Sequence, residues 1–350
     1  MPPAWPMPQH RNAATQCSKS LGLVDSAQAM GMSANQAYQL ALRAERARPA
    51  RATPGFRLYW MTSRELGSID LGAGSAPFLV VGRHTQCDVV LRADPTVALR
   101  HVLVRAEQLD DGCALLHVLD LHTHNGFVLA DGTSERSMAT AEPVFLRVGA
   151  YGLVALPSGV ALPEELAAPT AERRAAPPYR VKAAPVAPSP HPIPCPWPSP
   201  SPSPSPRAPH RPAPASHITL MPRPVDLSER APNASGAGDY ELVLHAAERS
   251  AGVRLSVDDL DRGVLVGRAP RCVDAGLQAV LNMAISRVHL LLIRDRLGCT
   301  AYDLASTQGT YHDARRVRSL ALADSGTALG LAMAGSVQLH WRGLAAAASS

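Results

Sequence analysis

The stretches LVVGRHTQC at residues 79–87 and VLVGRAPRC at residues 264–272 carry nearly the same pattern. In each, three aliphatic residues lead into Gly-Arg, and a cysteine follows four positions after the arginine. A short aliphatic run that ends at glycine is typical of a buried strand followed by a tight turn. The two stretches are 185 residues apart, which suggests that one structural unit occurs twice.

Further blocks support this repeat. ALRH at 98–101 corresponds to SRVH at 286–289, with an offset of 188 residues. DLHTHNG at 120–126 corresponds to DLASTQG at 303–309, with an offset of 183 residues. Because the blocks keep their order at a nearly constant offset, we interpret the two regions as homologous domains.

Both regions consist of short apolar runs separated by turn residues. The runs occupy 78–81, 88–91, 101–104, 114–121 and 127–129 in the first region, and 241–246, 263–266, 288–293, 300–304 and 336–341 in the second. Runs of this length that are rich in Val and Leu predict strands, and many short strands predict a sandwich or barrel. We therefore expect an all-β chain with two antiparallel β-sandwich domains, at 55–157 and 239–343.

The N-terminal segment, residues 1–54, is an Ala- and Arg-rich tail. Ser33 and Gln36 within it have the spacing of a capping box, so one short helix is expected over 37–48. Its apolar face is mostly alanine and would bury little area. The helix is therefore either a docking element for a partner or part of an unpacked tail.

Residues 158–238 contain 21 of the 32 prolines of the chain. Such a composition cannot offset its ordering entropy by apolar burial, so we expect a disordered, semi-stiff linker between the two domains. A ligand for an SH3-type domain is an alternative for this segment. Residues 344–350 are expected to be a disordered C-terminus.

The formal net charge of +5 is not placed where a nucleic-acid-binding surface needs it. By region the net charge is +4 in 1–54, −3 in 55–157, +3 in 158–238 and +1 in 239–350. No apolar run approaches the ~20 residues of a membrane-spanning helix. Neither a secretory signal nor a Cys-x-x-Cys motif occurs. We therefore expect a cytoplasmic protein that binds neither nucleic acid nor membrane.

The ordered set of motifs resembles the forkhead-associated (FHA) domain family. That family has Gly-Arg after a strand, then Ser-x-x-His, then Asn-Gly after an Asp-Leu strand end. The resemblance covers about 55–157 and 239–343 and occurs twice. It implies antiparallel FHA/SMAD-like β-sandwiches whose loops at one end bind a phosphothreonine peptide, and it fits a bacterial signalling or secretion-assembly setting.

The second repeat carries side chains suited to this ligand. Phosphothreonine has a charge of about −1.5 to −2 and three strong acceptor oxygens, so its site needs an arginine fork and short donors. We expect the fork from Arg268, a hydroxyl from Ser286 and a further donor from Thr307. Arg287 is expected to add a second cation. Gln308 stands where the resemblance implies an asparagine that holds the peptide main chain.

Three further residues of the second repeat are expected to be structural. Gly267 and Gly309 are interpreted as positions of unusual dihedral angles or close backbone approach. The resemblance implies that His289 is a buried residue that braces the loop, and we assign it no catalytic role.

The first repeat departs from the pattern. It retains Arg83, His101, Asn125 and Gly126. Ala98 replaces the signature serine, Leu99 replaces the polar residue after it, and His124 replaces the threonine. Losing a hydroxyl that binds a charged group typically costs ~1.5–3 kcal/mol. We therefore expect a degenerate, vestigial site in a domain that serves as a scaffold, an oligomerisation surface or a phosphate-independent binder.

A zinc site is an alternative for the first repeat. Cys113, His117, His122 and His124 lie within twelve residues. Their spacing matches no closed Cys/His framework, so we expect no metal.

The functional prediction is a phosphothreonine-binding adaptor that acts through the second domain. The alternative is a phosphate-independent assembly scaffold, such as a secretion-system accessory protein. No nucleotide-binding, esterase or zinc-protease motif occurs, so neither an enzyme nor a cofactor is expected. The expected partners are substrates of a Ser/Thr kinase. A linker phosphorylated at Thr170 or Thr219 would be an intramolecular ligand.

Overall fold

The computed structural model describes seven segments, and all of them lie in one compact unit formed by Met1–Ala161 and His217–Ser350. The segments are 32–48, 53–73, 78–158, 218–229, 238–296, 298–333 and 336–344. Most of the expected linker, with Thr170, lies outside the described residues, as does the C-terminus beyond 344. The architecture is all-β, as expected, with mostly antiparallel sheets and three short α-helices among the described residues.

The first sandwich consists of two six-stranded sheets. One sheet has the order β2 (Leu66–Gly72), β1 (Gly55–Met61), β11 (Tyr151–Pro157), β10 (Val144–Val148), β7 (Phe127–Leu129) and β8 (Ser134–Glu135). The other has the order β12 (Thr219–Leu220), β9 (Ser137–Thr140), β6 (Ala114–Asp120), β5 (Val102–Gln108), β3 (Phe78–Gly82) and β4 (Val89–Val90). Within these sheets only β3 and β4 pair in parallel.

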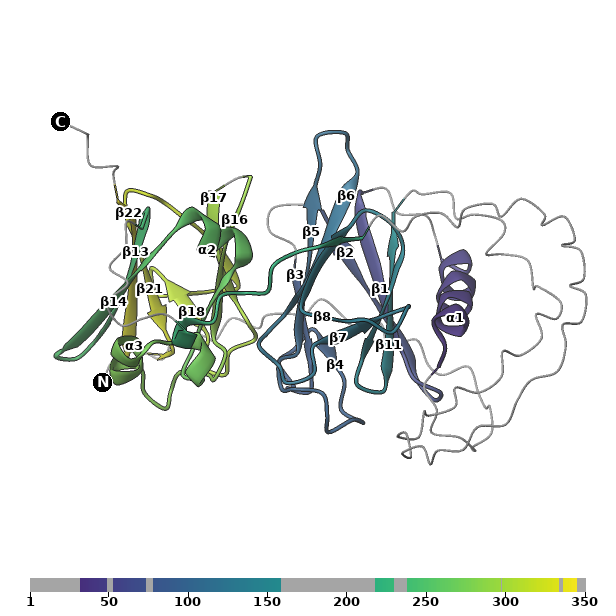
Figure 1. Ribbon diagram of the computed structural model, residues 1–350, viewed down its shortest axis with the longest axis horizontal. Helices are drawn as coiled ribbons and strands as arrows, with labels where there is room; N and C mark the ends of the chain where they lie inside the picture. The colour runs from purple at the N-terminus through teal and green to yellow at the C-terminus, as the bar shows by residue number, and fades with distance from the viewer. Residues whose placement is uncertain are drawn as a thin grey trace, which may run out of the picture. The chain divides into compact units, whose positions relative to one another are not determined.

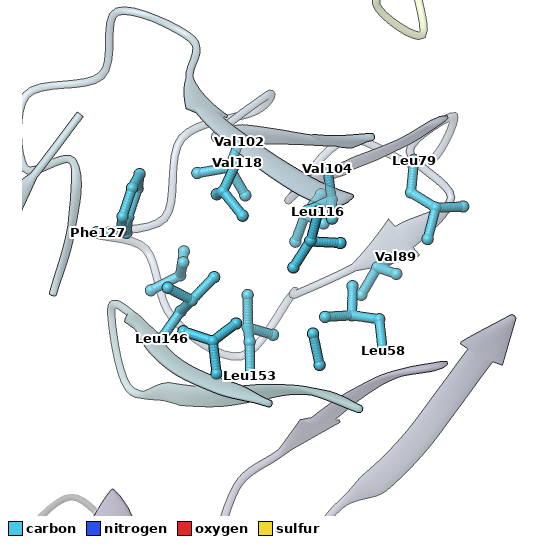
Figure 2. Packing of buried hydrophobic residues seen from close by; sticks show 14 of the residues in the cluster. Leu58, Leu79, Val89, Val102, Val104, Leu116, Val118, Phe127, Leu146 and Leu153 are labelled. Carbon is cyan, nitrogen blue, oxygen red and sulfur yellow. The ribbon is translucent and has the colours of Figure 1, made fainter. Parts of the chain in front are cut away.

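The core of the first sandwich lies between its two sheets. Figure 2 shows Val102, Val104 and Val118 of one sheet facing Leu58 and Leu153 of the other. These residues are essentially inaccessible to solvent. Because successive side chains of a strand point to opposite faces, every second residue of each central strand enters this core.

Helix α1 (Ala34–Arg46) covers the outer face of the first sheet, beside β11 (Figure 1). It begins at the capping box of Ser33 and Gln36. Its buried face is formed by Ala37, Ala41 and Leu42. The helix explains why all seven residues of β1 and of β11 are buried, although an uncovered sheet would expose every second one.

A charged group also links α1 to this sheet. The Glu45 carboxylate accepts hydrogen bonds from Arg57 (3.0 Å) and from the Tyr59 hydroxyl (2.6 Å), both on β1. The expected helix is therefore present, and it docks on its own chain.

The second sandwich pairs a six-stranded sheet with a four-stranded one. The larger has the order β14 (Arg249–Leu255), β13 (Tyr240–Ala246), β22 (Val337–Gly343), β21 (Thr327–Leu331), β18 (Thr310–His312) and β19 (Arg315–Val317). The smaller has the order β15 (Val264–Val266), β16 (Leu290–Asp295), β17 (Gly298–Asp303) and β20 (Ser319–Leu322). Helices α2 (Val257–Arg262) and α3 (Ala275–Val280) and the 3₁₀ turn η3 (Pro270–Cys272) lie in the connections around β15.

The two sandwiches share their strand order and specific backbone bonds. The order β2-β1-β11-β10-β7-β8 has its counterpart in β14-β13-β22-β21-β18-β19. The His101 N–H donates to the carbonyl of Val81 in the first sandwich, and the His289 N–H donates to that of Val266 in the second. The repeated sequence blocks therefore occupy corresponding places in the two sheets.

Residues 218–229, which fall within the expected linker, contact both sandwiches. Strand β12 pairs with β9 of the first sandwich, and Ile218 packs against its core. Val225 forms an isolated parallel bridge with Val264, and Leu227, in the 3₁₀ turn η2 (Leu227–Glu229), is fully buried in the second core.

None of the described helices is long and apolar enough to cross a membrane.

The docking of α1 can be tested with Ala37→Asp. The substitution places a carboxylate in the buried helix–sheet contact, so we expect the free energy of unfolding in urea to fall by about 2 kcal/mol or more. Asn35→Asp is the control, because it puts the same group on an exposed position of the first turn, where the helix dipole favours it. Equal stabilities of the two variants would contradict the docked position of α1.

Candidate functional site

The first component of the site is the turn after β15. The Arg268 N–H donates to the carbonyl of Ser286 (3.1 Å), and its side-chain Nε donates to the carbonyl of Ile285 (3.0 Å). A Cβ at Gly267 would lie 2.3 Å from the carbonyl oxygen of Arg287, so only glycine permits this approach. The turn and the loop at 285–287 are therefore in direct backbone contact.

Ser286 joins this turn to the next loop. Its side chain is buried, and its Oγ accepts a hydrogen bond from the Thr307 N–H at 3.1 Å. Nη2 of Arg100, a residue of the first sandwich, lies 3.4 Å from the same oxygen. No described residue accepts a hydrogen bond from the serine hydroxyl itself.

The loop that carries Thr307 is held by a buried carboxylate. Asp303 accepts hydrogen bonds from the Ser306 backbone N–H (2.8 Å), the Ser306 hydroxyl (2.5 Å) and the Thr310 hydroxyl (2.7 Å). The Ser306 hydroxyl in turn accepts from the Gly309 N–H at 3.0 Å. Gly309 has φ +84°, a conformation that favours glycine. This network fixes both ends of the loop and leaves its tip exposed.

The expected site residues are brought together to different extents. Hydrogen bonds connect Arg268, Ser286 and Thr307 in one cluster. Arg287 and Gln308 are exposed neighbours of that cluster. No hydrogen bond joins their side chains to another described residue.

His289 supports the cluster through a hydrogen bond with the Ser286 backbone. It is fully buried, and its Nδ1 accepts the Ser286 N–H at 3.2 Å, so its proton is on Nε2. Burial lowers the pKa of His289 to about 4, because desolvation of the charged ring outweighs the attraction of Asp303 and the Gly309 backbone. The ring is therefore neutral at physiological pH.

The first sandwich has the same backbone arrangement with different side chains. The Arg83 N–H donates to the carbonyl of Ala98 (2.9 Å), and its Nε donates to that of Val97 (2.5 Å). Ala98 offers no hydroxyl at the position of Ser286. His124 and Asn125 are exposed at the tip of the loop.

The brace is also present in the first sandwich. His101 is buried, its Nδ1 accepts the Ala98 N–H at 3.0 Å, and its Nε2 lies 2.7 Å from the carbonyl of Gly126. Burial lowers the pKa of His101 as well. Gly126 has φ +64°, like its counterpart Gly309.

The residues considered for zinc do not form a metal site. His117 is buried beside Glu107, with 3.2 Å between its Nε2 and the carboxylate, while Cys113 and His124 are exposed. Across the described part of the chain, no three His, Cys, Asp or Glu side chains are placed to hold a metal ion.

Sequence reasoning assigned no role to Asp303 and Ser306, which hold the loop. The repeat contained a signal for them: an aspartate followed three positions later by a hydroxyl residue occurs as Asp303/Ser306 and as Asp120/Thr123. The Thr123 hydroxyl donates to Asp120 and accepts the Gly126 N–H in the same way. Arg100 was also missed, and the sequence contains no signal for it.

Comparison with known families identifies one region of the chain. Residues 264–327 match the FHA domain family, so the second sandwich contains an FHA domain. No curated protein matched the chain.

Several solved FHA domains are similar to parts of the chain. The FHA domain of CT664 from Chlamydia trachomatis is 19% identical, with a TM-score of 0.25, and the match covers 29% of this chain and 96% of that one. FHA-1 of Rv1747 from Mycobacterium tuberculosis is 22% identical, with a TM-score of 0.23 and coverages of 31% and 99%. The yeast Dun1 FHA domain, solved with a doubly phosphorylated peptide from Rad53, is 16% identical, with a TM-score of 0.27 and coverages of 39% and 95%.

The buried histidine predicts how stability depends on pH. The pKa of His289 is about 4 in the folded state and near 6.5 when unfolded, so the unfolded chain binds the proton first as pH falls. The full stabilisation is therefore present above pH 6.5 and decreases toward pH 4, by up to roughly 3 kcal/mol for this group.

This dependence can be measured by urea unfolding at a series of pH values. His289→Gln should flatten the pH dependence between 6.5 and 4, whatever its effect on stability at neutral pH. The exposed His245 supplies the control, His245→Gln, which should keep the wild-type slope. Identical slopes for all three proteins would show that His289 does not titrate as inferred.

Proposed function

We propose that the second sandwich binds phosphothreonine-containing peptides through Arg268, Ser286 and Thr307. The observation that carries the proposal is the hydrogen-bonded cluster in which the Ser286 hydroxyl meets the Thr307 amide beside the anchored Arg268. A phosphate needs a permanently charged fork together with short polar donors, and this cluster offers both.

The orientation of Arg268 suits this role. Its Nε is occupied by the Ile285 carbonyl, and no described residue accepts a hydrogen bond from its two terminal nitrogens. An Arg held at one nitrogen loses less conformational entropy when its other donors bind a ligand. The terminal nitrogens would form the bidentate contact with two phosphate oxygens.

Two exposed residues would complete the recognition of the peptide. Arg287 adds a cation beside Ser286, and Gln308 offers an amide that can hold the peptide main chain. Gly267, His289 and Gly309 act indirectly, because they keep the two loops in contact.

We further propose that residues 55–157 are a second, degenerate copy of the FHA domain. The shared strand order and the equivalent Arg83 and His101 contacts support a common origin. Ala98 and His124 remove the hydroxyls expected to bind phosphate. This sandwich therefore functions as a scaffold, and a phosphate-independent assembly role for the whole chain is the second candidate function.

The proposed partners are proteins phosphorylated on threonine by a Ser/Thr kinase in the cytoplasm, and the chain would act as an adaptor without enzymatic activity. Binding of a phosphorylated linker in cis is a further option. Thr219, one candidate position, is exposed but lies in β12, so its binding to the second sandwich would require β12 to leave β9.

The proposal is tested with the full chain and a degenerate phosphothreonine peptide library. Arg268→Ala should weaken binding at least tenfold, because a charge-assisted contact contributes about 1.5–3 kcal/mol. Arg83→Ala is the matched control, since it removes the corresponding arginine of the first sandwich. We expect that variant to bind like the wild type.

The same titration with phosphoserine and unphosphorylated libraries measures selectivity. We expect the phosphothreonine library to bind best and the unphosphorylated one not to bind. Equal losses in the Arg268→Ala and Arg83→Ala variants would contradict the assignment to the second sandwich. Equal binding of phosphorylated and unphosphorylated libraries would favour the assembly role.

A further inference from the structure

The two sandwiches are packed against each other through an apolar cluster, which we call the inter-sandwich cluster. Its buried members are Phe78, Val80, Cys87, Leu103, Leu119 and Leu121 of the first sandwich and Leu265, Cys272, Leu291, Ile293, Tyr302 and Leu304 of the second. Val80 and Leu265 occupy corresponding positions of the repeat, as do Cys87 and Cys272. Each sandwich thus contributes largely the same face.

Strand burial shows that this contact is part of the fold. Leu290 and Leu292 of β16 point into the second core, while Leu291 and Ile293, on the opposite face, belong to the inter-sandwich cluster. An FHA domain without this partner would expose the second pair to water, at a cost of about 25 cal/mol per Å² of apolar surface.

Polar contacts surround the cluster. Arg105 pairs with Asp295 at 2.8 Å, and Arg318 pairs with Asp88 at 2.7 Å. The ring of Phe78 meets that of Tyr302 edge-on, with centroids 4.9 Å apart. Two ion pairs and one aromatic pair thus accompany the apolar contact.

Arg100 extends from this interface to the candidate phosphate site. Its Nε donates to the carbonyls of Leu304 (2.5 Å) and Ala305 (3.1 Å), and its Nη2 bonds to Ala305 and lies 3.4 Å from Ser286 Oγ. The side chain is buried. It therefore holds the backbone that leads directly to Thr307.

A second residue of the first sandwich contacts the same loop. The side-chain amide nitrogen of Gln86, in the orientation that satisfies its hydrogen bonds, lies 2.8 Å from the carbonyl of Ser306 and 3.2 Å from that of Ala305. Two donors of the first sandwich thus bind successive carbonyls of the 304–306 backbone.

Arg100 forms no ion pair in the described part of the chain, although the buried carboxylate of Asp303 attracts its charge. Its hydrogen-bond partners there are carbonyl and hydroxyl oxygens, and no carboxylate lies within ion-pair distance. Burial lowers the pKa of this guanidinium, yet arginine stays charged in proteins. A phosphate bound at Ser286 would add a second negative charge near this guanidinium, next to the hydroxyl that Arg100 contacts.

We propose that the first sandwich is a built-in part of the phosphopeptide site, in which Arg100 positions the 304–307 loop and contributes a positive charge that forms no ion pair within the described residues. This inference rests on the proposed function of the second sandwich. The degenerate copy would then have lost its own ligand and become a component of its neighbour's site. Arg100 is a positioning residue, because it does not touch the ligand itself. It acts through its contacts with Ser286 and the loop carbonyls and through the electric field of its charge.

The test compares Arg100→Gln, which keeps donors but removes the charge, with Arg100→Lys, which keeps the charge but not the fork. In the full chain, Arg100→Gln should weaken binding of the phosphothreonine peptide library at least tenfold, and Arg100→Lys about threefold. Arg92→Gln, at an exposed position of the first sandwich, should bind like the wild type. Melting temperatures identify any variant that does not fold.

Two further readouts separate this role from simple destabilisation. Arg100→Gln should reduce the salt dependence of binding, since one cation near the phosphate is lost. Hydrogen exchange at the Thr307 amide should accelerate, because its bond to Ser286 depends on the positioned loop.

The proposal is overturned if folded Arg100→Gln binds within threefold of the wild type. If that variant does not fold, Arg100→Lys with wild-type affinity overturns it. A wild-type chain that binds no phosphothreonine peptide contradicts the proposed function itself. If Arg268→Ala abolishes binding but Arg100→Gln does not weaken it, only the inference about Arg100 is contradicted.

Discussion

The backbone of Gly267 lies so close to the carbonyl of Arg287 that a single Cβ would separate them, and the candidate site depends on this approach. It brings the Arg268 N–H onto the Ser286 carbonyl, while the Nε of the same residue donates to the carbonyl of Ile285. Gly82 has the same relation to Leu99, where a Cβ would lie 2.4 Å from the carbonyl oxygen. The same backbone contact is thus present in both sandwiches, although a serine follows it in one loop and an alanine occupies that position in the other.

Buried polar groups maintain this geometry at both loops. The neutral His289 accepts a hydrogen bond from the Ser286 amide, and the buried Asp303 accepts hydrogen bonds from the amide and the hydroxyl of Ser306. Each group satisfies donors that would otherwise be buried without partners, which is costly in a low-dielectric interior. The loop tips therefore stay exposed while their bases are rigid, a favourable condition for binding a charged ligand with little loss of entropy.

The strands that the sequence predicts are those whose apolar residues form a short run bounded by turn residues. Strand β7 was predicted with its observed bounds, and β3 and β15 were each within one residue of the prediction. Strands β1 and β11 were not predicted, because α1 covers their outer face and removes the alternation that identifies a half-exposed strand. Strand β14, RSAGVRL, has too few apolar residues to stand out.

The residues of the candidate site also fall into a group that the sequence predicts and a group that it does not. Arg268, Ser286 and Thr307 were predicted from short local motifs that resemble the FHA signature and from the donors that a phosphate needs. Arg100 could not be predicted, because the loop carbonyls that it binds lie more than 200 residues away and main-chain acceptors leave no pattern in a sequence. Its position depends on the packing of the two sandwiches, which no local pattern encodes.

The path of the chain around residues 159–217 has a consequence for evolution. The chain leaves the first sandwich at Ser158, which is bonded to Gly55, and it returns to that sandwich at β12. Only the few residues from Met221 to Val225 then lead to the second sandwich. Both described ends of the proline-rich stretch therefore lie on the first sandwich. A change in the length of that stretch would therefore leave the Met221–Val225 connection between the two β-sandwiches unchanged.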